Sequence, residues 1–251
     1  MEENENIYDK IKELLGSLPG QLSVLEEQID IELQLEYFEF SRRVKKDFKP
    51  GLALEESYKL FEEFTPIEEK KSLLARIASL DKVEAFRIIE KFRKGNPGEL
   101  KNWSILALQE NRMLLESKLL DESHVFISTG LGGKGEKLRY FVVIFGREID
   151  DFSELQKKII RTEFEISLRK FTSELEELNF SGSIAAMRVM IPMKVIIKQI
   201  FTTAIAECNQ YGNFLVPNFI ITNVKALTFK EIREYINNQQ KLSNGRESVN
   251  K

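Results

Sequence analysis

The spacing of apolar residues over the first half of the chain predicts a series of amphipathic helices. Apolar side chains recur there three or four residues apart, which places them on one face of a helix. Segments that hold Gly or Pro separate most of these stretches and would end the helices. The predicted helices cover residues 7–15, 21–48, 65–80, 81–92 and 100–115. We therefore expect residues 1–121 to form an α-helical region.

Two of the predicted helices carry start signals. Thr65 is a favoured N-cap residue, Pro66 suits the first helical position, and Glu68 completes a capping box. Asp81 is a second N-cap candidate, because its side chain can accept hydrogen bonds from free N–H groups at a helix start. These signals predict two consecutive helices that meet at Asp81.

The pattern changes near Ser123, where short apolar runs begin to alternate with helix-like stretches. We expect strands at 125–129, 138–145, 186–191 and 214–224, and helices at 152–178, 193–208 and 228–235. This order, β-β-α-β-α-β-α, predicts a small mixed sheet with helices packed on it. The expected fold class is thus α+β, with an α+β domain at residues 122–240 and a polar, flexible tail at residues 241–251.

Two local signals add detail to this second domain. Pro217 lacks the N–H group that a central strand uses, so its strand should lie at an edge or carry a bulge. Thr228 and Glu231 have the spacing of a capping box, so the last helix should begin there.

One pattern in the helical region combines an apolar helix face, an aspartate and an apolar-arginine pair: Leu74, Ile77, Leu80, Asp81 and Phe86-Arg87. It resembles a HEAT-type helical repeat over residues 54–118. The resemblance implies a scaffold of helix pairs, which commonly presents a protein-binding surface. A self-sufficient solenoid needs about three repeats, and no period recurs that often here. Three ordinary packed helices are therefore the alternative interpretation.

The composition is typical of a globular protein with a sizeable core, since 42% of the 251 residues are hydrophobic and 31% are charged. A single cysteine, Cys208, excludes an internal disulfide framework and fits a reducing compartment. The acidic N-terminus lacks the apolar segment of a signal peptide. Charged residues and Pro192 interrupt the most apolar window, residues 184–208, which argues against a membrane span. We expect a cytoplasmic protein with no membrane partner.

Charge is unevenly distributed, although the net charge is only −3. That value excludes a globally basic nucleic-acid binder but not a local basic patch. Residues 1–40 are strongly acidic, whereas residues 128–147 hold four cations and one glutamate. The cluster Arg42–Lys46 is also basic. It is better explained by the helix dipole, which favours cations at a helix C-terminus.

The most informative stretch is Ser128–Lys137, which holds four of the 13 glycines. It lies between two predicted strands, so we expect a glycine-rich hairpin. Gly133-Lys134 is followed by Gly135 and a strand, which excludes both the P-loop and the dinucleotide-binding motif. Its backbone could still form a nest for an anion, or its cations could contact a partner. A plain, flexible hairpin tip is the alternative. The candidate anion- or partner-binding residues are Gly130, Gly132, Gly133, Lys134, Gly135, Lys137 and Arg139.

Other reactive side chains form no recognisable site. His124 is the single histidine, and no motif joins it to a nucleophile such as Ser123 or Ser128. Cys208 lies in an apolar helix and is expected to be a small buried hydrophobe. The acidic residues lack the spacing of a calcium-binding loop. We therefore predict no catalytic residues, no metal site and no cofactor.

These observations favour a non-enzymatic interaction or regulatory protein. Its helical half would bind a protein partner, and the basic hairpin would contact an anionic surface such as RNA. A second hypothesis is an enzyme that acts on a phosphorylated or otherwise anionic small molecule held by the loop Gly130–Gly135. A third is a homo-oligomeric structural protein that uses its acidic N-terminal helices as the interface.

Overall fold

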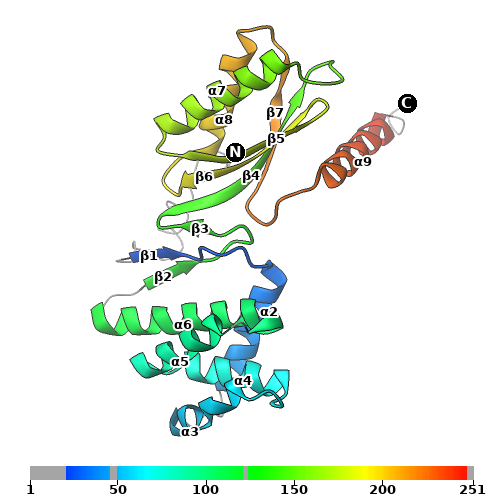
Figure 1. Cartoon of the computed structure of the whole chain (residues 1–251). Coiled ribbons are helices and arrows are strands. Elements are labelled where there is room, and N and C mark those ends of the chain that lie inside the picture. Colours follow the sequence, from blue (N-terminus) through cyan, green and yellow to red (C-terminus); the bar gives the residue numbers. More distant parts are fainter. Residues whose placement is uncertain (1–20, 46–49, 96, 121–123, 248–251) are drawn as a thin grey trace. The chain divides into compact units, whose positions relative to one another are not determined.

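The computed structural model describes residues 21–45, 50–95, 97–120 and 124–247. The chain forms two compact units, an N-terminal unit that ends at Gly135 and a C-terminal unit that continues from Glu136 (Figure 1). The N-terminal unit is mainly helical and the C-terminal unit is built on an antiparallel sheet. The predicted α+β fold class is confirmed. The helix predicted at residues 7–15 lies outside the described residues.

The N-terminal unit packs its helices around one apolar core. Its elements are β1 (Gln21–Val24), α2 (Ile31–Val44), α3 (Pro50–Glu55), the 3₁₀ helix η2 (Glu56–Phe61), α4 (Ile67–Ala78), α5 (Val83–Lys94), the 3₁₀ helix η3 (Gly98–Leu100), α6 (Lys101–Leu120), β2 (His124–Ile127) and β3 (Gly133–Lys134). Trp103 of α6 lies at the centre of the core, where its ring contacts those of Tyr37 and Phe40 edge to face. The aromatic side chains thus hold α2 against α6.

The single helix predicted over residues 21–48 is wrong in its first part. Gln21–Val24 is a strand, β1, which pairs in parallel with β2 from the far end of the unit. Helix α2 begins only after Asp30, whose carboxylate accepts the N–H of Glu32 at 2.8 Å. The local period of apolar residues therefore holds for α2 but is overridden at β1 by a partner strand about 100 residues away in sequence.

Two predicted helix starts are also displaced, each by one residue. Pro66 adopts an extended conformation (φ −56°, ψ 144°) and takes the N-cap position itself, so α4 begins at Ile67. Asp81 does not cap α5, whose N-cap residue is Lys82. The Asp81 carboxylate instead forms an ion pair with Lys118 of α6.

The C-terminal unit is a sheet with helices on one face. Its elements are β4 (Lys137–Gly146), α7 (Glu154–Lys170), β5 (Glu174–Ser181), β6 (Ile184–Pro192), α8 (Ile197–Asn209), β7 (Leu215–Thr222) and α9 (Phe229–Glu247). The strands lie in the order β7-β4-β6-β5, and each neighbouring pair is antiparallel. This is the split β-α-β-β-α-β arrangement of ferredoxin-like folds. The sheet is thus antiparallel rather than mixed.

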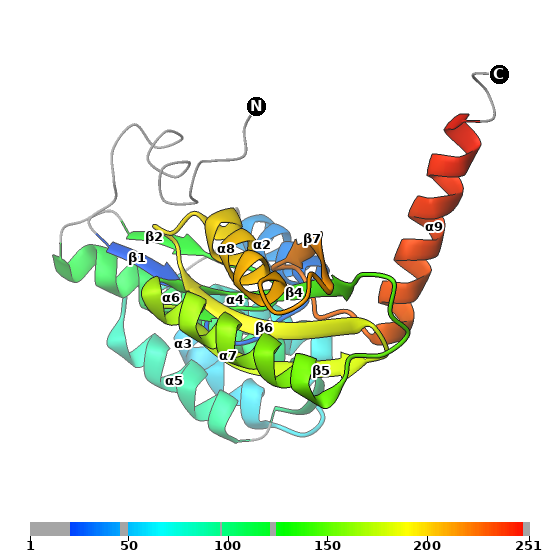
Figure 2. The same cartoon turned by 90° about the horizontal axis from the view of Figure 1, so that it is seen from above.

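Helices α7 and α8 cover the same face of this sheet (Figure 2). Phe164 of α7 and Phe201 of α8 lie 6.2 Å apart, measured between ring centroids. Phe201 in turn lies 5.2 Å from Phe219 of β7. The buried residues of β4 and β6 complete this core, so the unit is held together mainly by apolar contacts between two helices and one sheet face.

The long helix predicted over residues 152–178 is wrong in its last part. Helix α7 ends at Lys170, Thr172 adopts φ +55°, and the chain returns as β5. Leu175 and Leu178 are three residues apart, which suggests a helix. In the strand, a register shift between Leu175 and Glu177 adds one residue, so that both leucines pair with the same apolar row of β6. The β-bulge therefore explains how two leucines with the spacing of a helix can lie on one face of a strand.

The predictions for the end of the chain agree better with the structure. Pro217 lies in β7, an edge strand whose pairing with β4 is irregular between Ile144 and Gly146. Thr228 and Glu231 form the predicted capping box, since the N–H of Glu231 donates to Thr228 Oγ1 at 3.2 Å and the N–H of Thr228 donates to Glu231 at 2.7 Å. Helix α8 begins at Ile197, four residues later than predicted.

Candidate functional site

The glycine-rich stretch is not one exposed loop between a pair of hairpin strands. The preceding strand, β2, pairs with β1 and not with β4. Gly130, Gly132 and Gly133 are buried, whereas Lys134 and Gly135 are exposed. Gly135 adopts φ +59° in the short turn between β3 and β4. Only the end of the stretch therefore has the exposure that a contact surface needs.

The buried glycines pack against the segment that follows β1. A Cβ atom on Gly132 would lie 2.6 Å from the carbonyl oxygen of Glu26 and 2.8 Å from that of Glu27. The N–H of Gly133 donates to the Leu25 carbonyl at 2.9 Å, and the N–H of Gly132 donates to the Thr129 carbonyl at 3.2 Å. These two N–H groups are already used within the protein, so neither points to a free anion nest.

A buried glutamine fixes the start of the same stretch. Gln34 of α2 donates through Nε2 to the carbonyl of Ile29 at 2.7 Å and lies 3.4 Å from that of Thr129. Its Oε1 accepts the hydroxyl of Ser128. Since Gln34 is 5% exposed, these bonds are shielded from water and hold the glycine stretch in place.

The three predicted cations differ in their surroundings. Lys134 is exposed on β3. Lys137 and Arg139 lie on β4 and form ion pairs with two glutamates of β5: Lys137 Nζ lies 2.6 Å from Glu174, and Arg139 donates to both oxygens of Glu176 at 2.6 and 2.9 Å. The carboxylates offset much of the positive charge that the sequence places here.

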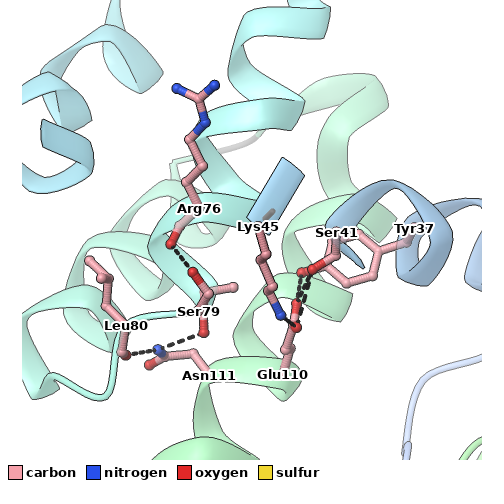
Figure 3. Close-up of polar contacts among 9 residues, drawn as sticks. Tyr37, Ser41, Lys45, Arg76, Ser79, Leu80, Glu110 and Asn111 are labelled. Atoms are coloured by element: carbon pink, nitrogen blue, oxygen red, sulfur yellow. Dashed lines mark hydrogen bonds and ion pairs between the residues drawn. The ribbon is translucent and has the colours of Figure 1, made fainter. Parts of the chain in front are cut away.

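A polar cluster that the sequence analysis missed lies between α2 and α6 (Figure 3). Tyr37, Ser41 and Lys45 project from α2 toward Glu110 of α6. The tyrosine hydroxyl donates to Glu110 Oε2 at 2.6 Å, the serine hydroxyl donates to the same oxygen at 3.0 Å, and the lysine forms an ion pair with the carboxylate. Burial and the neighbouring carboxylate raise the pKa of Tyr37 well above its usual value, so its hydroxyl stays protonated.

This cluster lines one side of a groove of about 460 Å³. Its walls are Phe38, Lys45, Ala78, Ser79, Glu110, Met113, Leu114 and Ser117. The carboxylate oxygens of Glu110 already accept three donors, which leaves little capacity for a general base. On the adjacent turn, Asn111 donates to the carbonyls of Ala78 and Leu80 at 3.0 and 2.6 Å and so secures the end of α4. The arrangement serves to join three helices.

Four exposed apolar side chains of the N-terminal unit lie close together in sequence where η2 leads into α4. We call Tyr58, Phe61, Phe64 and Ile67 the aromatic patch; their exposed fractions are 57%, 48%, 94% and 40%. Phe61 and Ile67 also line a groove of about 420 Å³, whose other walls include Phe92, Gly95, Pro97, Gly98, Glu99 and Leu100. Phe61 is fixed by an edge-to-face contact with Phe92 and by Lys91 above its ring.

Acidic residues are frequent in the sequence around the aromatic patch. Residues 55–69 hold six glutamates and a single lysine, Lys59. Lys59 already pairs with Glu56 and Glu69 at 3.2 and 3.0 Å. Glu62 and Glu63 are exposed directly beside Phe64. Charges of both signs therefore lie beside the patch, since Lys70 lines the same groove and Lys91 lies above the Phe61 ring.

Three other residues considered in the sequence analysis lie within a regular strand or helix. His124 begins β2. Arg42 and Arg43 lie in the last turn of α2, as expected for cations near a helix C-terminus, and Arg43 stacks on Phe40. Within the described parts of the chain, no group of three His, Cys, Asp or Glu side chains is arranged as metal ligands. None of the helices there is long and apolar enough to cross a membrane.

Cys208 is fully buried in α8, and its thiol is expected to be unreactive in the folded protein. Burial, followed by the carboxylates of Glu163 and Glu207, raises its pKa to about 12. Alkylation requires the thiolate, whose fraction at pH 8 falls about a thousandfold when the pKa rises from 9 to 12. We predict that iodoacetamide labels Cys208 rapidly in urea but not in buffer, as measured by intact mass. Equal labelling rates in both conditions would contradict this placement.

No protein-family model matches the chain, and a search of curated proteins gives no significant match.

Proposed function

We propose that this chain is an interaction protein whose N-terminal unit binds a protein partner through the aromatic patch. The observation that carries this proposal is the exposure of Phe64 and its neighbours around a groove. A side chain such as Phe64 has a large apolar surface, and leaving it in water is unfavourable unless a partner covers it. Aromatic residues are also the side chains most often found at the centre of protein interfaces.

The border of the patch indicates the chemistry of the partner. Glu62 and Glu63 are exposed beside Phe64, which favours a partner with Lys or Arg next to the apolar anchor that meets this side chain. The basic hairpin gives less support for a second, anionic partner, because Lys137 and Arg139 already pair with Glu174 and Glu176. The proposal therefore rests on the helical unit alone.

Replacing Phe64 with serine should abolish partner binding without affecting the fold, because this side chain is 94% exposed. Loss of one aromatic anchor typically weakens an interface by more than tenfold. The test is affinity capture from lysate with the full chain, followed by mass spectrometry, comparing the wild type with Phe64→Ser. The expected result is at least one protein that is retained by the wild type and lost with the variant.

The matched control is Leu155→Ser, which removes a 68% exposed apolar side chain from α7 in the C-terminal unit. It should retain the same proteins as the wild type. Retention by Phe64→Ser of every protein that the wild type captures would refute the proposal. So would equal losses with both variants, since that outcome would indicate non-specific apolar adhesion.

A further inference from the structure

The two edges of the C-terminal sheet differ in charge. β5 forms one edge and carries Glu174, Glu176 and Glu177. β7 forms the opposite edge, and its sequence Leu215–Thr222 contains no charged residue. Exposed strand edges tend to pair with other strands, and natural proteins usually prevent this with charges, proline or bulges. The β5 edge has that protection, and most of the β7 edge does not.

The protection of β7 is confined to its first half. Pro217 and the irregular pairing opposite Ile144–Gly146 lie there. From Phe219 to Thr222 the strand pairs regularly with β4, ending with Thr222 opposite Phe141. In the part of the chain that the structure describes, β4 is the one strand that pairs with β7. The outward backbone groups of residues 218–222 thus form a regular, uncharged template.

We propose that β7 pairs antiparallel with β7 of a second copy of the chain, with the two-fold axis at Ile220. The segment Asn218-Phe219-Ile220-Ile221-Thr222 has a polar residue at each end and apolar residues between them. A two-fold axis at Ile220 places Ile220 opposite Ile220 of the second copy. Phe219 then lies opposite Ile221, and Asn218 opposite Thr222. Each residue then meets a side chain of similar polarity, which is the self-complementarity that a two-fold interface requires.

The remaining geometry fits the same register. Pro217, which has no N–H to donate, falls just outside the paired segment. Phe219 contacts Phe201 of α8 and therefore lies on the helix-covered face of the sheet. Residues directly opposite each other in an antiparallel pair share a face, so Phe219 and Ile221 of the two copies would extend the existing core. Two β7-β4-β6-β5 sheets would become one continuous sheet.

The first measurement is the molar mass of the full chain by size-exclusion chromatography with light scattering. At about 100 µM, which favours dimers with micromolar dissociation constants, we expect twice the chain mass of 29.2 kDa. A mass of 29.2 kDa would overturn the proposal. In that case the partner of the uncharged β7 edge would be a strand of another protein.

The register is tested by two double variants at the same positions. Asn218→Lys with Thr222→Lys places lysines opposite each other across the two-fold axis, and we expect a monomer. Asn218→Lys with Thr222→Glu places each lysine opposite a glutamate, and we expect the dimer to persist. Both variants lose the same hydrogen bond, in which Thr222 Oγ1 accepts the N–H of Val224 at 3.1 Å. The pair therefore differs only in cross-strand charge.

A variant on the opposite edge completes the test. Asn179→Lys adds a cation to exposed β5 and should leave the mass unchanged. Far-ultraviolet circular dichroism establishes that each variant is folded. A dimer that survives the double lysine variant, or one that both double variants disrupt equally, would overturn the proposed register.

Discussion

Gly132→Ala is expected to destabilise the N-terminal unit by about 4 kcal/mol, because the added methyl group has no space to occupy. Its Cβ would lie 2.6 to 2.9 Å from three backbone carbonyl oxygens, those of Glu26, Glu27 and Leu25. Backbone cannot move aside as a flexible side chain can, so the two crossing segments must separate. Gly132 also adopts φ +68°, a conformation that alanine disfavours.

The measurement is urea unfolding followed by tryptophan fluorescence. Trp103 is the single tryptophan and is buried in the N-terminal unit, so its emission reports on that unit. Gly135→Ala is the matched control. It has a similar φ of +59°, but no atom lies within 4 Å of its added Cβ. It should cost only the conformational strain of about 1 kcal/mol. Equal losses in the two variants would show that the close approach at Gly132 is not maintained in solution.

Glu110→Ala should give the second largest loss of stability, about 3 kcal/mol in the same fluorescence experiment. Its carboxylate accepts from Tyr37, which is fully buried, and from Ser41, which is 1% exposed. Both hydroxyl groups are buried, so removal of Glu110 leaves each of them without its hydrogen-bond acceptor. Lys45 loses its ion-pair partner as well.

Two further variants separate the contributions. Glu110→Gln keeps the size of the side chain and one acceptor oxygen, so it should cost less than Glu110→Ala. Asp81→Ala removes an exposed carboxylate that pairs with Lys118 of α6, the helix that also carries Glu110. This change should have no measurable effect on stability. If Asp81→Ala were as damaging as Glu110→Ala, burial of the hydroxyl groups would not explain the loss.

Sequence reasoning succeeded where the structure is decided locally. The capping box at Thr228 and Glu231 and the edge position of Pro217 both follow from backbone hydrogen bonds that neighbouring residues make or lack. It failed at β1 and β5, where the partner strand decides the conformation. β1 depends on β2, and the leucines of β5 owe their three-residue spacing to a bulge. The local spacing of apolar residues reveals neither the partner strand nor the bulge.

The candidate sites show the same division. The sequence points to the glycine-rich stretch as a place that an anion or a partner could contact. What approaches Gly132 is the chain's own backbone. The cluster around Glu110 did have a sequence signal, because Tyr37, Ser41 and Lys45 recur every four residues and so share one face of α2. The aromatic patch had none, since the sequence does not reveal that Phe64 is left exposed between η2 and α4.

The pairing of β1 with β2 has a consequence for the order of folding. The helices of the N-terminal unit can form contacts over short sequence separations, whereas β1 must find a strand that lies about 100 residues further along. Closing so long a loop is entropically costly unless the intervening helices have already brought its ends together. We therefore expect β1 to stay unpaired during synthesis until β2 has left the ribosome, and the packing around Gly132 to be the last step in the folding of this unit.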